Sequence, residues 1–397
     1  MRDLLLRNLR PMGGSAVDML LRSGRIAEIA PRLHAEGILV EDCGGAIAIP
    51  GLVEAHTHLD KTVMGMGWYE NAVGTELRAM IDNERAERRR LGLDPNRQSM
   101  RHALALVGAG CTHARSHVDI DTEHGLAMLE GVLATREDLA EIIDIQIVAF
   151  PQSGLLMRPG TLELLDEALA LGADLVGGLD PSGMDRDPKG HLDAVFGLAE
   201  KHGKGVDIHL HEAGTLGAFS LELIMERTRA LGMQGSVAVS HAFCLGMNDW
   251  PVTEALIAGL AECDIAILTT GAPSREVPQV KRLHAAGVRL GAGCDGVLDT
   301  WSPLNRPDMI DRARIIAMRN NLRSDADLAL ALEICSLGGA RVMGLPDYGL
   351  TVGCKADLTL LDAETLAEGA ISEASRPLVI KSGCITARHG KSLRKAP

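Results

Sequence analysis

The chain has 397 residues, a formal net charge of −13 and 46% hydrophobic residues. An acidic chain of this kind lacks the basic surface that nucleic-acid binding needs, and no apolar run reaches the roughly 18 residues of a membrane span. The first residues lack the apolar core of a signal peptide, and the eight cysteines include no C-x-x-C pair. We therefore expect a cytoplasmic protein with reduced thiols that binds neither nucleic acid nor membranes.

Eight strand-like runs alternate with helix-like segments through the middle of the chain. The strands are predicted at residues 46–58, 112–119, 142–152, 175–180, 206–211, 237–243, 265–270 and 288–295. Helices are predicted between them at residues 125–142, 162–171, 192–202, 221–231 and 250–261. Alternation at this spacing is typical of parallel βαβ units, and eight such units can close a barrel. The predicted fold class is therefore α/β, with a (β/α)8 TIM-like barrel.

The two ends of the chain show a different pattern, with short strands and no helix alternation. These strands are predicted at residues 3–8, 17–21, 25–29, 356–361, 377–381 and 384–388. Ser23-Gly24 and Ser382-Gly383 lie between paired runs and are typical of hairpin turns. We predict one small β-sandwich formed by residues 1–50 and 345–397, flanking a hydrolase barrel of residues 51–344.

An H-x-H pair, His56 and His58, stands at the end of the first predicted barrel strand. Side chains two residues apart on a strand point to the same face, so both imidazoles could bind one divalent metal. Two unrelated histidines on a polar strand face are an equal alternative if this motif is taken alone.

Three later strands also end in residues that can bind a metal, namely His209, His241 and Asp295. The carboxyl ends of the strands of a (β/α)8 barrel meet on the face that carries the active site. A mixed set of histidine and aspartate ligands fits zinc, iron(II) or manganese, with one position left open for water. The four strand ends together therefore favour a metal site over unrelated polar residues.

The order of these motifs, H-x-H, then H-x-x-E, then S-H and then G-x-D, resembles the amidohydrolase superfamily. Within it the chain is similar to the cytosine deaminase group, with the related N-isopropylammelide aminohydrolases. Further matching stretches lie at residues 115–119, 144–154, 174–181 and 295–301. The resemblance covers nearly the whole chain, and it implies the same barrel with a small β domain made from both chain ends.

The resemblance implies one divalent metal, zinc or iron(II), with His56, His58, His209 and Asp295 as its ligands. Two-metal amidohydrolases also use a modified lysine at the end of strand four, whereas this strand ends at residues 177–180 without a lysine. A single metal is therefore expected. Water bound to such a metal ionises near neutral pH, which makes hydroxide available for hydrolysis.

Three residues are the expected catalytic groups beside the metal. The resemblance implies that Glu212 carries a proton to the substrate, and a surface glutamate is the alternative. His241 is expected to hydrogen-bond the nucleophile, and a core histidine is the alternative. Asp295 could also accept the proton of the water. N-isopropylammelide aminohydrolases have aspartate in place of Glu212, so the glutamate favours chemistry like that of cytosine deaminase.

Three further residues are expected to bind the substrate. Gln152 ends the third barrel strand, and its amide offers one acceptor and two donors to a lactam edge. Trp301 could stack on a planar heterocycle, and Lys61 could contact an anionic one. Cytosine deaminases carry a second aspartate directly after the ligand aspartate, where this chain has Gly296. We expect this glycine to leave space for a larger ring.

These observations predict a hydrolytic deaminase of an amino-substituted nitrogen heterocycle larger than cytosine, such as a pterin or a triazine. The reaction would release ammonia or an amine. Ring-opening hydrolysis of a cyclic amide is the alternative. The expected partner is a small-molecule substrate, and a homo-oligomer is expected.

Overall fold

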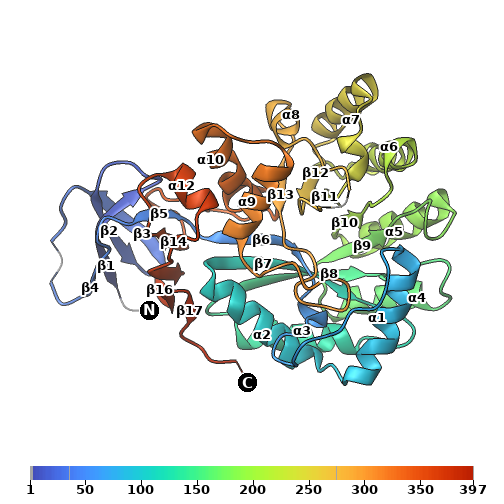
Figure 1. Cartoon of the computed structure of the whole chain (residues 1–397), viewed down its shortest axis with the longest axis horizontal. Helices are drawn as coiled ribbons and strands as arrows, with labels where there is room; N and C mark the ends of the chain where they lie inside the picture. Colours follow the sequence, from blue (N-terminus) through green and yellow to red (C-terminus); the bar gives the residue numbers. More distant parts are fainter. Residues whose placement is uncertain (1–2, 35, 274, 397) are drawn as a thin grey trace.

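Two sheets organise the chain in its computed structural model, which describes residues 3–34, 36–273 and 275–396. One is an eight-stranded parallel sheet surrounded by helices, and the other has nine strands and is formed by both ends of the chain (Figure 1). The predicted α/β class, with a (β/α)8 barrel and a flanking β-sandwich, is confirmed.

The barrel sheet follows the order of the sequence. Its strands are β6 (Leu52–Thr57), β7 (Cys111–Asp119), β8 (Asp144–Phe150), β9 (Leu175–Leu179), β10 (Gly205–His209), β11 (Val237–Ser240), β12 (Ala266–Thr269) and β13 (Leu290–Ala292). Neighbouring strands pair in parallel. The seam between β13 and β6 is joined by the bridge between Thr57 and Asp295. The nearly closed barrel thus brings the first and last predicted ligand strands side by side.

The helices pack outside the barrel or follow its last strand. They are α1 (Leu77–Leu91), α2 (Pro95–Gly108), α3 (Ala127–Asp138), α4 (Thr161–Leu171), α5 (Pro188–His202), α6 (Gly214–Ala230), α7 (Trp250–Glu262), α8 (Val280–Ala285), α9 (Met309–Arg319), α10 (Asp325–Ile334), α11 (Leu337–Val342) and α12 (Leu366–Ile371). Short 3-10 turns lie at Leu59–Lys61 and Phe243–Gly246. Among the described residues, no helix is both long and apolar enough to span a bilayer.

Local sequence explains where several of these helices begin. Asp94, Asp187 and Asp249 are N-caps whose carboxylates accept hydrogen bonds from backbone N–H groups of the first turn. A proline follows each of them within the first two helical positions, where its missing N–H costs nothing. Strands β11 and β12 are buried along their whole length, as expected for parallel strands covered by helices.

The nine-stranded sheet contains strands from both ends of the chain (Figure 1). Its strands are β1 (Leu4–Pro11), β2 (Val17–Arg22), β3 (Arg25–Ala30), β4 (Leu39–Asp42), β5 (Ile47–Pro50), β14 (Leu358–Leu361), β15 (Leu378–Lys381), β16 (Cys384–Arg388) and β17 (Lys391–Ser392). Both predicted hairpins are present, since Arg22 pairs with Arg25 and Lys381 with Cys384. Leucines from β1 and β14 share one apolar core. The domain boundaries at 50/51 and 344/345 stay a prediction.

One predicted strand is wrong, because the run 46–58 is divided between the two sheets. Residues of β5 pair with β14 in the terminal sheet, and β6 begins the barrel. Gly51 lies at the break, where an added Cβ would stand 2.3 Å from the Thr112 hydroxyl oxygen. The close approach of two chain segments at this point therefore separates the strands, although the apolar run continues through it.

Candidate active site

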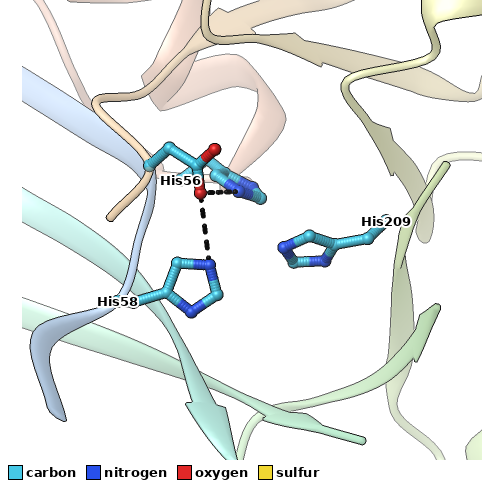
Figure 2. Close-up of side chains that lie close together, drawn as sticks. His56, His58 and His209 are labelled. Atoms are coloured by element: carbon cyan, nitrogen blue, oxygen red, sulfur yellow. Dashed lines mark ion pairs between the residues drawn. The ribbon is translucent and has the colours of Figure 1, made fainter. Parts of the chain in front are cut away.

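The four predicted metal ligands lie together at the carboxyl ends of three barrel strands. One ligand atom from each of His56, His58, His209 and Asp295 lies within 4.8 Å of the others. His56 and His58 come from the end of β6 and face His209 from β10 (Figure 2). The Asp295 carboxylate lies 3.6 Å from Nε2 of His56 and 3.3 Å from Nε2 of His58.

The state of these side chains fits a divalent metal. Nε2 of His56 and both ring nitrogens of His209 are buried without a hydrogen-bond partner among the described residues. Burial, with a smaller contribution from Lys61, lowers the pKa of His58 to about 3, so this imidazole is neutral. Burial opposes ionisation of Asp295, yet the surrounding histidines hold its pKa well below the usual range. Neutral imidazoles around a carboxylate are the donor set that zinc and iron(II) accept.

The backbone turns sharply where three of the barrel strands end. Asp180 after β9, His241 after β11 and Asp295 after β13 have φ values of 38°, 68° and 64°. Such left-handed conformations are uncommon for residues with a side chain, although aspartate and histidine tolerate them better than most. Strain of this kind persists where the surrounding structure enforces it, and it gathers at functional sites.

Glu212 lies just beyond His209, and its carboxylate is fully engaged by the protein. One oxygen accepts hydrogen bonds from the backbone N–H groups of Ser182 and Gly183 at 2.8 and 2.7 Å, and the other accepts from the Ser220 hydroxyl. Burial raises the pKa of Glu212, against the hydrogen bonds that lower it. A glutamate in this state is oriented toward the turn after β9 and can hold a proton more readily than a solvated one.

His241 and His211 form a second layer of histidines beside the quartet. Their ring centroids are 4.4 Å apart, and His241 lies 4.8 Å from His56. Nε2 of His241 is buried and has no hydrogen-bond partner among the described residues. His211, by contrast, is held by Asp180 through a contact of 2.9 Å. His241 therefore has a buried nitrogen that is available to a ligand, whereas Asp180 fixes the orientation of the His211 ring.

Of the three predicted substrate residues, Lys61 contacts both of the others. Lys61 Nζ donates to Gln152 Oε1 at 3.1 Å and lies 5.6 Å from the centre of the Trp301 ring. Because an ammonium group only donates, the Gln152 amide must present its oxygen to Lys61. The amide nitrogen of Gln152 donates to no described residue. It is thus the part of this side chain that can bind an acceptor on a substrate.

A buried charge cluster, formed by Asp60, Lys61, Glu84, Arg88 and Asp119, surrounds this contact. Lys61 lies 3.3 Å from Glu84 and 3.4 Å from Asp119, and Arg88 donates to the same two carboxylates. Burial lowers the pKa of Lys61, but Asp119 and Glu84 outweigh it, so the pKa is raised and the charge is compensated within the protein. Arg88 of α1 is therefore buried among carboxylates.

The space expected beside Gly296 is filled, which corrects the sequence-based expectation. A Cβ added to Gly296 would lie 1.8 Å from Oδ2 of Asp299. Asp299 is buried, and its other oxygen accepts hydrogen bonds from the backbone N–H groups of Trp301 and Ser302 at 2.8 and 2.9 Å. Burial raises the pKa of Asp299 to about 6. A carboxylate is therefore present at this edge of the site, supplied from three residues further along the chain.

Other residues of the site carried weak sequence signals. Asp207 stands two positions before His209 on β10 and so shares its face, and Ser240 directly precedes His241. The Ser240 hydroxyl donates to Asp207 and also lies next to Nδ1 of His56. Asp180 directly follows β9, and its carboxylate accepts a hydrogen bond from the backbone N–H of His211 and contacts the His211 ring.

Comparison with known proteins agrees with this geometry. The model of the amidohydrolase family matches residues 39–387. N-isopropylammelide isopropylaminohydrolase from Burkholderia multivorans ATCC 17616 superposes with a TM-score of 0.96 at 50% identity, covering 99% of this chain and 100% of that one. N-isopropylammelide isopropyl amidohydrolase from Pseudomonas sp. (strain ADP) is 32% identical over 391 residues, 96% of each chain. 5-methylcytosine deaminase from Klebsiella pneumoniae, liganded with 5-fluorocytosine, has a TM-score of 0.85 at 29% identity and covers 98% of this chain and 99% of its own.

A (β/α)8 barrel with a histidine and aspartate cluster at the carboxyl ends of its strands defines a hydrolase that acts on C–N bonds. The chain belongs to the amidohydrolase family, within its cytosine deaminase-like group. The resemblance drawn from the sequence motifs is thereby confirmed.

Proposed function

We propose that this protein hydrolyses an amino or alkylamino substituent from a nitrogen heterocycle at a single divalent metal, zinc or iron(II). The observation that carries the proposal is the convergence of three buried imidazoles on the Asp295 carboxylate, with ring nitrogens that lack hydrogen-bond partners among the described residues. Such a metal, when bound, lowers the pKa of water to roughly 7 and polarises the substrate.

The residues around the proposed metal site supply the remaining parts of the reaction. Glu212 holds or releases a proton. The Ser220 hydroxyl can keep its hydrogen bond to Glu212 in both states, because it donates to a carboxylate and accepts from a carboxylic acid. The buried Nε2 of His241, which has no hydrogen-bond partner among the described residues, is available to hydrogen-bond the developing tetrahedral centre. Gln152 donates from its amide nitrogen to an acceptor on the ring, and Trp301 provides a flat apolar surface.

The proposed substrate class is an aminotriazine or another ring larger than cytosine, such as a pterin. The similarity to two proteins named for N-isopropylammelide supports an alkylamino group on a triazine. Lys61 would act through Gln152, because its own charge is already compensated by Glu84 and Asp119. A homo-oligomer in the cytoplasm remains the prediction for the protein in solution.

A panel of amino-heterocycles tests this function directly. N-isopropylammelide, other aminotriazines, pterin and cytosine are compared by kcat/KM, with ammonia and alkylamine measured as products. The protein is assayed metal-free and after reloading with zinc or iron(II), and His209→Ala serves as the variant that should lose the metal. Ring-opened products without released amine would point to a cyclic amide hydrolase instead. Cytosine as the best substrate by a wide margin would contradict the larger ring.

A further inference from the structure

A chain of buried hydrogen bonds reaches His56 from the side opposite the metal ligands. Arg115 Nη1 donates to Oδ2 of Asp207 at 2.8 Å. The Ser240 hydroxyl donates to Oδ1 of Asp207 at 2.7 Å, and Ser240 Oγ lies 2.8 Å from Nδ1 of His56. All four side chains are buried, and they come from four barrel strands, β7, β10, β11 and β6.

The direction of each hydrogen bond follows from what each group can donate. A guanidinium only donates, and a carboxylate paired with it only accepts. Ser240 therefore uses its single proton on Asp207, and its oxygen is left to accept from His56. Nδ1 of His56 must then carry the ring proton. The lone pair is on Nε2, the nitrogen that lies 3.6 Å from the Asp295 carboxylate without a hydrogen-bond partner among the described residues.

We propose that Arg115, Asp207 and Ser240 are positioning residues that hold His56 in the Nδ1–H tautomer, so that Nε2 is available as a metal ligand. This inference rests on the metal site proposed above. Histidine ligands commonly donate their second N–H to a carboxylate or another acceptor, which fixes the ring and raises its basicity. Here the acceptor is a serine that is itself directed by an arginine-bound aspartate.

A second metal site is the competing explanation for the same residues. Ligand atoms of His56, His117 and Asp207 also lie within 4.8 Å of one another. Both oxygens of Asp207 are, however, already bound by Arg115 and Ser240. A second dication would have to share one of these oxygens and stand close to the positively charged Arg115 guanidinium, which repels it. The structure therefore favours support of His56 over a second metal.

Asp207→Asn gives the sharpest test because Arg115 dictates the orientation of the new amide. The guanidinium requires an acceptor, so the amide oxygen faces Arg115 and the NH2 group faces Ser240. Ser240 then accepts from the amide and donates to Nδ1 of His56. That hydrogen bond favours the Nε2–H tautomer, which cannot bind the metal. We expect the zinc affinity to fall by about 10–100-fold or more, the range found when such supporting groups are lost.

The measurements are made on metal-free protein that is then titrated. Zinc affinity is determined by competition with a chromophoric chelator, Co²⁺ loading reports the ligand field through its visible spectrum, and far-ultraviolet circular dichroism checks the fold. Ser240→Ala removes the acceptor and should also weaken zinc binding, whereas Ser240→Thr keeps a hydroxyl and should restore it. Ser99→Ala, at a buried serine on α2, is the matched control for loss of a hydroxyl and should bind zinc normally.

The outcomes separate the possible errors. Absence of metal uptake by the wild-type protein would refute the proposed metal site itself. One tightly bound metal in the wild type, with unchanged affinity and Co²⁺ spectrum in Asp207→Asn, would refute the positioning role alone. Loss of a second metal with the first one retained would establish the competing site. If Asp207→Asn fails to fold, the zinc affinities of Ser240→Ala and Ser240→Thr test the positioning role instead. Equal affinities in these two variants would refute it.

Discussion

Replacing Arg88 by methionine should destabilise the protein far more than the same change at its neighbour Arg89. The Arg88 side chain is 3% exposed, donates to Glu84 and Asp119, and lies 3.7 Å from Asp60. Its removal leaves three buried carboxylates with Lys61 as their remaining cation in the cluster. Breaking a buried ion pair on one side costs about 3–5 kcal/mol, since a charge is left without its partner.

Arg89→Met is the matched control on the same helix. The Arg89 side chain is 74% exposed and pairs with Glu123 at the surface. An exposed pair of this kind contributes about 0–1 kcal/mol, so the two variants should differ by at least about 2 kcal/mol in free energy of unfolding. Methionine has nearly the helix propensity of arginine, so α1 itself is not weakened.

The assay is urea unfolding of both variants and the wild type, followed by circular dichroism under identical conditions. Adding Asp119→Asn to the Arg88→Met variant removes one of the three carboxylates that are left with Lys61 alone, and it should recover part of the lost stability. Equal midpoints for Arg88→Met and Arg89→Met would refute the reasoning. The reasoning would also be refuted if the double variant lost more free energy of unfolding than the two single variants lose together.

Three further predictions concern the site itself. Glu212→Gln should keep metal and fold but lower kcat by about 10²-fold or more, because the amide cannot carry a proton. Glu222→Gln, at an exposed position on α6, is the control. Near-normal turnover in Glu212→Gln would contradict the proton-transfer role of Glu212. Gly296→Ala should raise KM with unchanged metal content, since the new Cβ would lie 1.8 Å from Oδ2 of Asp299 and must displace it; an unchanged KM would show that Asp299 does not shape the pocket. Exhaustive treatment with a chelator should abolish amine release, and zinc or iron(II) should restore it, whereas activity that survives full metal removal would exclude the proposed mechanism.

Much of the fold could be predicted because the signals are local. Strand β10 is a short strand-like run that ends in His209, and helix α5 begins at an Asp-Pro pair. Hydrophobic periodicity and helix caps depend on neighbouring residues, so they can be recognised without knowledge of the rest of the chain. The break at Gly51 could not be predicted, because it depends on contact with Thr112, which is distant in sequence.

The sequence by itself determined the barrel and the types of metal donor, since alternation of strands and helices places each strand end on one face. The tertiary structure alone decided which groups meet there and which charges are already compensated. Ser240 reaches His56 across 184 positions of sequence, and Lys61 reaches Gln152 across 91. Asp299 turns back into the place beside Gly296. These contacts depend on long-range packing and on the geometry of hydrogen bonds. The partner of a side chain is set by distance in space, and separation along the chain carries almost no information about which residue that partner is.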